Sequence, residues 1–193
     1  MTLDFFYDVV CPYAYLGSVQ VEALARRTGA TLRWRPTLLG GLFRHVEAPQ
    51  NPGALMNPNK ARLNLLDMQR QAERLGVELT MPAAHPRRSV EAMRLLTACP
   101  DAARPALSHA LYRAYWVQGR DISDRAVLGE IAAEHGLGVA AIDDPAVKQA
   151  LFDTTAQAAG HGAFGVPALV IDGQRLYWGA DRLHFVEAAL GGP

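Results

Sequence analysis

The sequence has little cysteine and no excess of charge of either sign. Its 193 residues include two cysteines, Cys11 and Cys99, and 19 basic side chains balance 19 acidic ones. A balanced charge gives no electrostatic footprint for a nucleic acid or an anionic membrane. The sequence leaves a disulfide between Cys11 and Cys99 open, although a reducing compartment would disfavour it. We interpret Cys99 as a packing residue, because cysteine is among the most buried residue types.

Long hydrophobic runs are also missing. No apolar run is long enough to span a bilayer, and the first residues lack the basic segment and apolar core of a signal peptide. We therefore expect a cytoplasmic protein that binds neither nucleic acid nor membrane. Half of the residues are hydrophobic and a fifth are charged, as in ordinary globular proteins. The length suits one domain, or one domain with a large insertion.

One of the two cysteines stands where a strand pattern gives way to a helical one. Residues 4–10 are typical of a buried strand, and an apolar helical pattern follows Pro12, a residue suited to the first helical turn. Cys11 is therefore expected at a helix N-terminus, where unpaired N–H groups and the helix dipole favour an anion. We expect a lowered thiol pKa and a reactive cysteine there. A buried structural cysteine is the alternative.

Three segments follow one another along the chain. Residues 1–41 predict a strand, a helix ending near Gly29 and a second strand, which together form a parallel βαβ unit. The middle segment is almost all helical pattern, with helices over 61–75, 89–98, 102–117 and 124–135, the last capped by Ser123. The final segment predicts a helix over 147–159, strands over 168–171 and 175–178 joined by Asp172-Gly173, and a helix over 181–190.

This order predicts an α/β fold with a large all-helical insertion. Residues 1–41 and 145–193 would form the α/β domain, and residues 42–144 the helical insertion. The six histidines show no metal-ligand spacing, so no metal site is predicted.

A proline heads the predicted C-terminal hairpin. Pro167 would lose no ladder hydrogen bond as the first residue of a strand. A cis peptide between Val166 and Pro167 would turn the carbonyl and N–H of Val166 toward a peptide-like ligand. A reactive turn in the first βαβ unit and a proline before an antiparallel hairpin are the two halves of a thioredoxin-like arrangement.

The chain resembles a thioredoxin-like family with three known branches. They are the DsbA-type oxidoreductases, the kappa-class glutathione transferases and the 2-hydroxychromene-2-carboxylate isomerases, and the likeness is strongest to the last two. The motifs that carry it are Asp4-Phe5-Phe6-Tyr7-Asp8, Pro12-Tyr13-Ala14-Tyr15-Leu16, Arg35-Pro36 with Leu39-Gly40-Gly41, the loop from Asn51 to Lys60, Phe164-Gly165-Val166-Pro167, and Trp178-Gly179-Ala180-Asp181-Arg182.

The resemblance implies that glutathione is the cofactor. Its sulfur would lie at Cys11, and its cysteinyl backbone would pair with Val166 beside Pro167. Its γ-glutamyl end would meet Ala180 and Asp181, with Arg182 in the same group, at the N-terminus of the last helix. Asn51 and Lys60 match positions that hold the glycyl end. Without the resemblance, Asp181 would be an ordinary helix cap and Lys60 a solvated charge.

Two positions depart from the family pattern. The isomerases and kappa transferases usually have serine where this chain has Cys11, and the disulfide exchangers have a second cysteine where it has Ala14. Cys11 could form a mixed disulfide with glutathione, or donate a weak S–H bond to the glutathione thiolate. We therefore predict a glutathione-dependent isomerase that adds a thiol reversibly to a small conjugated aromatic substrate. The alternatives are a monothiol thiol-disulfide oxidoreductase or kappa-class transferase using Cys11, and a binding module without turnover. A homodimer is expected from the resemblance alone.

Overall fold

A four-stranded mixed sheet lies at the centre of the computed structural model, which describes residues 1–192. Its strand order is β2-β1-β3-β4. Strand β1 (Thr2–Tyr7) pairs in parallel with β2 (Thr31–Pro36) and antiparallel with β3 (Ala168–Ile171), which pairs antiparallel with β4 (Arg175–Trp178). The expected βαβ unit and hairpin are both confirmed. The hairpin turns at Asp172-Gly173, both in the left-handed region, as its sequence predicts.

Helix α1 (Pro12–Thr28) begins and ends where the sequence predicts. Cys11 is its N-cap residue, and Pro12 occupies the first helical position, where no N–H is needed. Gly29 ends the helix with a φ of 65°, a left-handed conformation that costs glycine little. The helix therefore starts directly at the cysteine.

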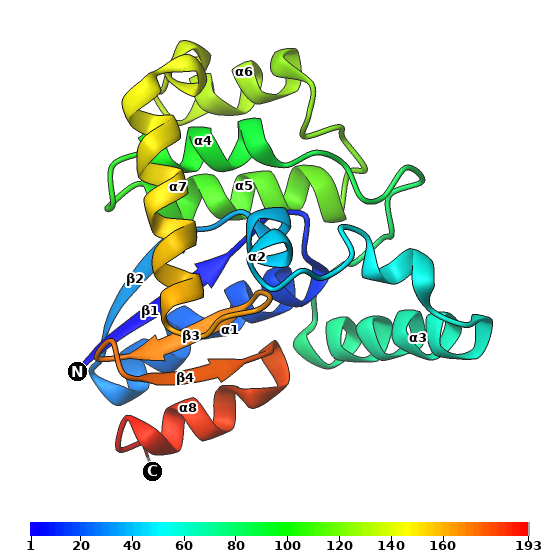
Figure 1. Cartoon of the computed structure of the whole chain (residues 1–193), viewed down its shortest axis with the longest axis vertical. Helices are drawn as coiled ribbons and strands as arrows, with labels where there is room; N and C mark the ends of the chain where they lie inside the picture. The colour runs from blue at the N-terminus through cyan, green and yellow to red at the C-terminus, as the bar shows by residue number, and fades with distance from the viewer. Residues whose placement is uncertain (193) are drawn as a thin grey trace.

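Helices cover both faces of the sheet (Figure 1). Alternation along the strands decides which side chains meet them. Asp4 of β1 faces Arg33 and Arg35 of β2, and Arg35 reaches Gln157 of α7 (Pro145–Gly160). Phe5 points to the other face, toward α1. The last segment, η3 (Ala180–Arg182) and α8 (Leu183–Ala189), also packs against α1. The predicted last helix thus begins as a single 3₁₀ turn.

The middle of the chain is helical, as expected. Helices α4, α5 and α6 stack beyond one end of the sheet, and α3 projects to the side (Figure 1). None of the helices within residues 1–192 has the length and hydropathy that a membrane crossing requires. The elements are α2 (Leu39–His45), η1 (Pro52–Leu55), α3 (Pro58–Leu75), α4 (Val90–Ala98), α5 (Arg104–Trp116), α6 (Arg125–Glu134) and η2 (Val139–Asp143).

The predicted cap of α6 is wrong by one residue. Asp124, not Ser123, is the N-cap, and its carboxylate accepts the N–H of Ala126 at 2.8 Å. The Ser123 hydroxyl donates instead to Asp121 at 2.6 Å. Both residue types are good caps. Asp124 takes the role because it directly precedes the first helical residue, Arg125.

One continuous core joins the sheet to the helical segment. Tyr7 at the end of β1 stacks on Phe5 and meets Tyr112 of α5, while its hydroxyl lies 2.6 Å from that of Ser108. Trp116 donates its indole N–H to the backbone oxygen of Val9 at 2.8 Å. The turn before Cys11 is therefore held by α5.

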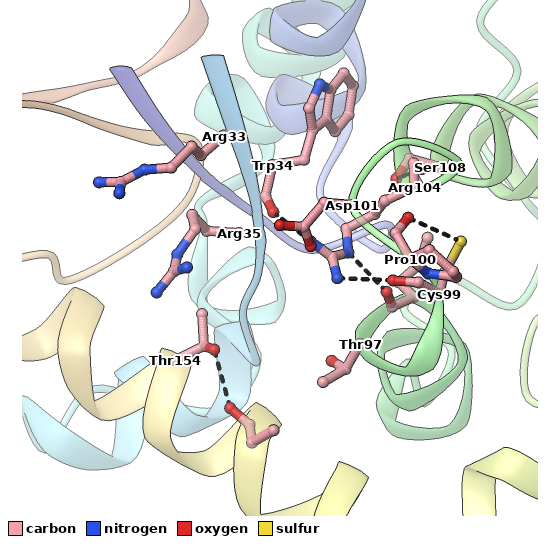
Figure 2. Close-up of polar contacts among 12 residues, drawn as sticks. Arg33, Trp34, Arg35, Thr97, Cys99, Pro100, Asp101, Arg104, Ser108 and Thr154 are labelled. Atoms are coloured by element: carbon pink, nitrogen blue, oxygen red, sulfur yellow. Dashed lines mark hydrogen bonds and ion pairs between the residues drawn. The ribbon is translucent and has the colours of Figure 1, made fainter. Parts of the chain in front are cut away.

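Cys99 and Arg104 lie at a second junction, where the end of α4 meets β2 (Figure 2). The Arg104 guanidinium donates to the backbone oxygens of Cys99 at 2.7 Å, Leu96 at 2.9 Å and Trp34 at 3.3 Å. It ties the end of α4 to the free edge of β2, whereas Arg33 and Arg35 point away from it (Figure 2). Cys99 and Cys11 are both free thiols, and Cys99 is buried, as a packing residue would be.

Candidate active site

The turn at Cys11 and the bend before the C-terminal hairpin are neighbours in space. The Sγ of Cys11 donates to the backbone oxygen of Val166 at 3.2 Å, across 155 positions of sequence. The Val166–Pro167 peptide is cis. A β-carbon on Gly17 of α1 would lie 3.5 Å from Pro167 and 3.7 Å from Ala180. Glycine therefore lets both residues pack closely on α1.

The pKa of the Cys11 thiol runs against the sequence-based expectation. The residue is only 6% exposed, and this burial raises the pKa to about 12, although the N–H groups of Ala14 and Tyr13 lower it. The helix N-terminus acts on the sulfur as expected, but removal of water from the thiolate outweighs it. The prediction of a lowered pKa is therefore wrong. Cys11 carries a neutral thiol at pH 7 and can act as a weak S–H donor.

A buried carboxylate, Asp8, lies beneath this turn. Its Oδ1 accepts the N–H of Val10 at 3.2 Å, and its Oδ2 accepts the N–H of Leu39 at 2.9 Å and the hydroxyl of Ser89 at 3.0 Å. Burial raises the pKa of Asp8 to about 6 despite these three hydrogen bonds. One side chain therefore joins the Cys11 turn to the starts of α2 and α4.

A pocket of about 900 Å³ opens beside Cys11. Its walls come from the α1 start, α2, η1, α3 and the loop before α4. Most of the wall is apolar, which suits a small aromatic molecule. The apolar wall includes Leu39, Phe43, Met56, Leu65, Met68 and Met81.

Basic and polar side chains interrupt that wall in one region. Arg44, His85, Arg87 and Arg88 all line the pocket. Arg87 is paired with Asp121 at 3.3 Å and Arg88 with Glu91 at 3.0 Å. Arg44 has no ion-pair partner within residues 1–192, so its charge is available to an anionic ligand.

Tyr13 connects this pocket to the last segment of the chain. It lines the pocket, and its hydroxyl donates to the side-chain oxygen of Asn64 on α3. Burial, together with the charges of Asp67 and Asp181, raises the pKa of Tyr13 to about 12. Tyr13 also packs against the small cluster that contains Leu16, Ala72 and Ala180, which links the pocket wall to the residue before Asp181.

The glutathione residues expected from sequence fall into two groups. Cys11 and Asn51 line the pocket, and the Asn51 side chain also caps η1 by accepting the N–H of Ala54 at 3.3 Å. The remaining residues do not line it: Lys60, Val166, Pro167, Ala180, Asp181 and Arg182. Of these, Val166, Pro167 and Ala180 gather at the α1 start. Asp181 and Arg182 are exposed and paired with each other, and Lys60 is exposed on α3.

Sequence reasoning missed Asp8, Ser89 and His85 as site residues. Asp8 was visible as an acid ending a hydrophobic strand, but its partners lie 31 and 81 positions away. The only signal for the other two was the polar run His85-Pro86-Arg87-Arg88-Ser89 after a proline. Such a run is typical of a solvated loop, so its place in the pocket could not be foreseen.

The chain matches known proteins over nearly its whole length. The family model of the DSBA-like thioredoxin domain matches residues 2–191. A 2-hydroxychromene-2-carboxylate isomerase of Sphingobium xenophagum is 31% identical over 98% of this chain and 97% of its own. Glutathione S-transferase kappa 1 of Rattus norvegicus is 28% identical over 98% of this chain and 90% of its own.

A solved structure shares the fold. The structure of a 2-hydroxychromene-2-carboxylate isomerase superposes with a TM-score of 0.83 at 24% identity, over 99% of this chain and 95% of the other. The expected thioredoxin-like α/β fold with a large helical insertion is thereby confirmed.

Proposed function

Since the chain belongs to the family of DSBA-like thioredoxin domains, and its relatives are isomerases and glutathione transferases, we propose that it is a glutathione-dependent isomerase. The proposed substrate is a small conjugated aromatic molecule that carries a carboxylate. The apolar wall of the pocket supports the aromatic part. The unpaired Arg44 supports the carboxylate.

The state of Cys11 carries the proposal. Its thiol is buried and neutral, and it already donates to a backbone oxygen. A nucleophile needs the thiolate form, so these properties favour glutathione, not Cys11, as the attacking sulfur. Cys11 would then donate its S–H to the glutathione thiolate. The resemblance gives this role to a serine hydroxyl in the isomerase branch.

Glutathione would lie across the α1 start in this proposal. The γ-glutamyl end would meet Ala180 and Asp181 beside Arg182, the cysteinyl backbone would pair with Val166 next to Pro167, and the glycyl end would reach Asn51 and Lys60. The contact of Cys11 with Val166 supports the middle of this path. The packing of Tyr13 against the cluster that contains Ala180 supports its γ-glutamyl end.

The reaction conserves its electrons without an external oxidant. The glutathione thiolate adds to one carbon of a conjugated double bond, a C–S bond forms, and the π pair moves onto the substrate carbonyl oxygen. The former double bond is now single and rotates. Elimination then breaks the C–S bond, returns the pair to the carbon skeleton and releases the isomer and the thiolate. The pocket would contribute orientation and exclusion of water.

Replacement of Cys11 by serine tests this proposal. Cys11→Ser supplies a stronger hydrogen-bond donor, and about 1 kcal/mol of hydrogen-bond free energy corresponds to roughly fivefold in rate. We therefore expect kcat/KM for 2-hydroxychromene-2-carboxylate, with glutathione present, to stay unchanged or rise by up to about fivefold. Cys99→Ser controls for the loss of a thiol elsewhere.

The opposite result would favour redox chemistry. A variant without isomerase activity, together with a rapid single glutathione adduct on Cys11 of the wild type after treatment with oxidised glutathione, contradicts the proposal. It would identify a monothiol oxidoreductase. Mass spectrometry of the intact protein distinguishes the two outcomes.

The proposal extends to location and assembly. Two free cysteines support a reducing, cytoplasmic compartment. Exposed leucines on α3, among them Leu63 and Leu66, support a homodimer. Sedimentation velocity at micromolar concentration would give the mass of the assembly directly.

A further inference from the structure

A histidine in the pocket wall is fastened to the turn that carries Cys11. His85 belongs to the loop between α3 and α4, and it lines the same pocket as Cys11. The loop is attached at one end by the Ser89 hydroxyl, which donates to Asp8 at 3.0 Å. The His85 ring lies 5.2 Å from the ring of Trp116, whose N–H is bonded to Val9. Two links thus hold His85 against the residues just before Cys11.

The hydrogen bonds of Tyr115 determine which ring nitrogen of His85 carries the proton. The Tyr115 oxygen accepts the backbone N–H of Arg87 at 3.1 Å and lies 2.9 Å from Nδ1 of His85. A hydroxyl has one proton to donate, and within residues 1–192 only Nδ1 is placed to accept it. Because Tyr115 is fully buried, its hydroxyl proton is satisfied only by donation to Nδ1, and this assignment leaves the proton of the neutral ring on Nε2.

The Nε2–H is then a donor without a partner. No side chain or backbone group in residues 1–192 hydrogen-bonds to Nε2, and the atom is not among those sealed from solvent. Burial lowers the pKa of His85 from its ordinary value, which keeps the ring neutral at pH 7. A neutral imidazole with a fixed tautomer on a pocket wall can donate a hydrogen bond from Nε2 to an oxygen of a ligand.

We propose that His85 is a further catalytic residue, whose Nε2–H donates a hydrogen bond to the carbonyl oxygen of the conjugated substrate. The inference rests on the proposed function. As the glutathione sulfur adds to the double bond, negative charge develops on that oxygen, and a preorganised donor stabilises it. No proton leaves His85, and the charge returns to the carbon skeleton when the C–S bond breaks. Tyr115 acts as a positioning residue through Nδ1.

Two variants of His85 test the inference by activity. His85→Phe keeps a ring but removes the donor, and we expect kcat with glutathione and 2-hydroxychromene-2-carboxylate to fall about 100-fold. His85→Gln keeps an N–H donor, and we expect a loss of about tenfold. The glutathione Kd of both variants should stay within about twofold of wild type. His135→Gln, at the end of α6 and outside the pocket, is the control and should retain full activity.

Nitrogen NMR provides a reading that does not depend on activity. In ¹⁵N-histidine-labelled protein at pH 7, with His85→Gln used for assignment, we expect the signals of a neutral ring protonated at Nε2. Tyr115→Phe should weaken that tautomer preference and lower kcat more than it changes KM.

The outcomes are separable. Wild-type protein without glutathione-dependent turnover overturns the proposed function and, with it, this inference. An active wild type with an equally active His85→Phe variant overturns this inference alone. A ring that is protonated at Nδ1 or charged at pH 7 does the same.

Discussion

The buried carboxylate of Asp8 couples the stability of this protein to pH. Asp8 is 1% exposed and accepts hydrogen bonds from three segments that are far apart in sequence. Its pKa of about 6 in the folded protein exceeds its ordinary value of 3.8. Between these two pH values the native state binds more protons than the unfolded state. Ionisation of Asp8 therefore destabilises the fold as pH rises.

The Asp8→Asn variant should remove the contribution of Asp8 ionisation to the pH dependence of the unfolding free energy. A pKa difference of about two units corresponds to roughly 3 kcal/mol. We expect the unfolding free energy of wild type, relative to Asp8→Asn, to fall by most of that amount between pH 4 and pH 7. Urea denaturation of both proteins across this range measures it, and the difference cancels the exposed acids that titrate alike in both. Parallel stability curves would contradict the account.

The thiol of Cys11 shows how burial can outweigh a property that the local sequence predicts. A cysteine before a proline at a helix start correctly predicted the position of Cys11 as the N-cap of α1. The lowered pKa did not follow, because burial is a property of everything packed around the sulfur. Local N–H groups lower the pKa of the thiol, and desolvation raises it further than they lower it.

At the scale of elements, Arg104 fastens a helix end to a strand edge. Its guanidinium donates to two backbone oxygens at the end of α4 and to one on β2 (Figure 2). The last carbonyls of a helix lack intrahelical partners, and β2 lies at the edge of the sheet. A planar fork with several donors satisfies oxygens on both elements at once.

Arg104→Lys should therefore be destabilising although the charge is kept. An ammonium group cannot reproduce the fork, and hydrogen bonds to charged groups contribute about 1.5–3 kcal/mol each. We expect a loss of about 2 kcal/mol in the unfolding free energy, measured by urea denaturation. Arg26→Lys is the control. Arg26 and Arg104 line one hollow beside β2, but the Arg26 side chain makes no hydrogen bond within residues 1–192, so its effect should stay within about 0.5 kcal/mol. Equal effects of both variants would show that the fork is unimportant.

The elements themselves were largely predictable. The spans of β3 and β4 match the sequence-based ranges, and α1 ends at the predicted glycine. Local chemistry fixes these ends: Asp172-Gly173 for the hairpin, Pro12 and Gly29 for the helix. The division into residues 1–41 with 145–193, and residues 42–144, stays a prediction. The core runs without a break across that division.

For the whole molecule, a ligand that binds only the native state should stabilise it. At a glutathione concentration of 100 Kd the expected gain is about 2.7 kcal/mol. For a chain of this size the gain corresponds to a rise in Tm of roughly 5–10 °C. Differential scanning calorimetry with reduced glutathione measures the shift.

Asp181→Asn gives this experiment its specificity. The variant removes the carboxylate proposed to meet the γ-glutamyl end of glutathione, so its Tm shift at the same concentration should be clearly smaller. Glu134→Gln, an exposed acid on α6, should show the wild-type shift. If Asp181→Asn is stabilised as much as wild type, the γ-glutamyl placement is wrong. No shift in any of the three proteins would argue against glutathione itself.

The sequence by itself determined the order of strands and helices along the chain and the helix that starts directly after Cys11. It also determined the hairpin after Pro167 and the likeness to one family. These features depend on neighbours within a few residues, where turn chemistry and hydrophobic periodicity act. Only the tertiary structure decided that Cys11 is buried and neutral, that Asp8 joins three segments and that His85 lines the pocket. Burial and long-range hydrogen bonds are set by residues distant in sequence, and no local pattern contains them.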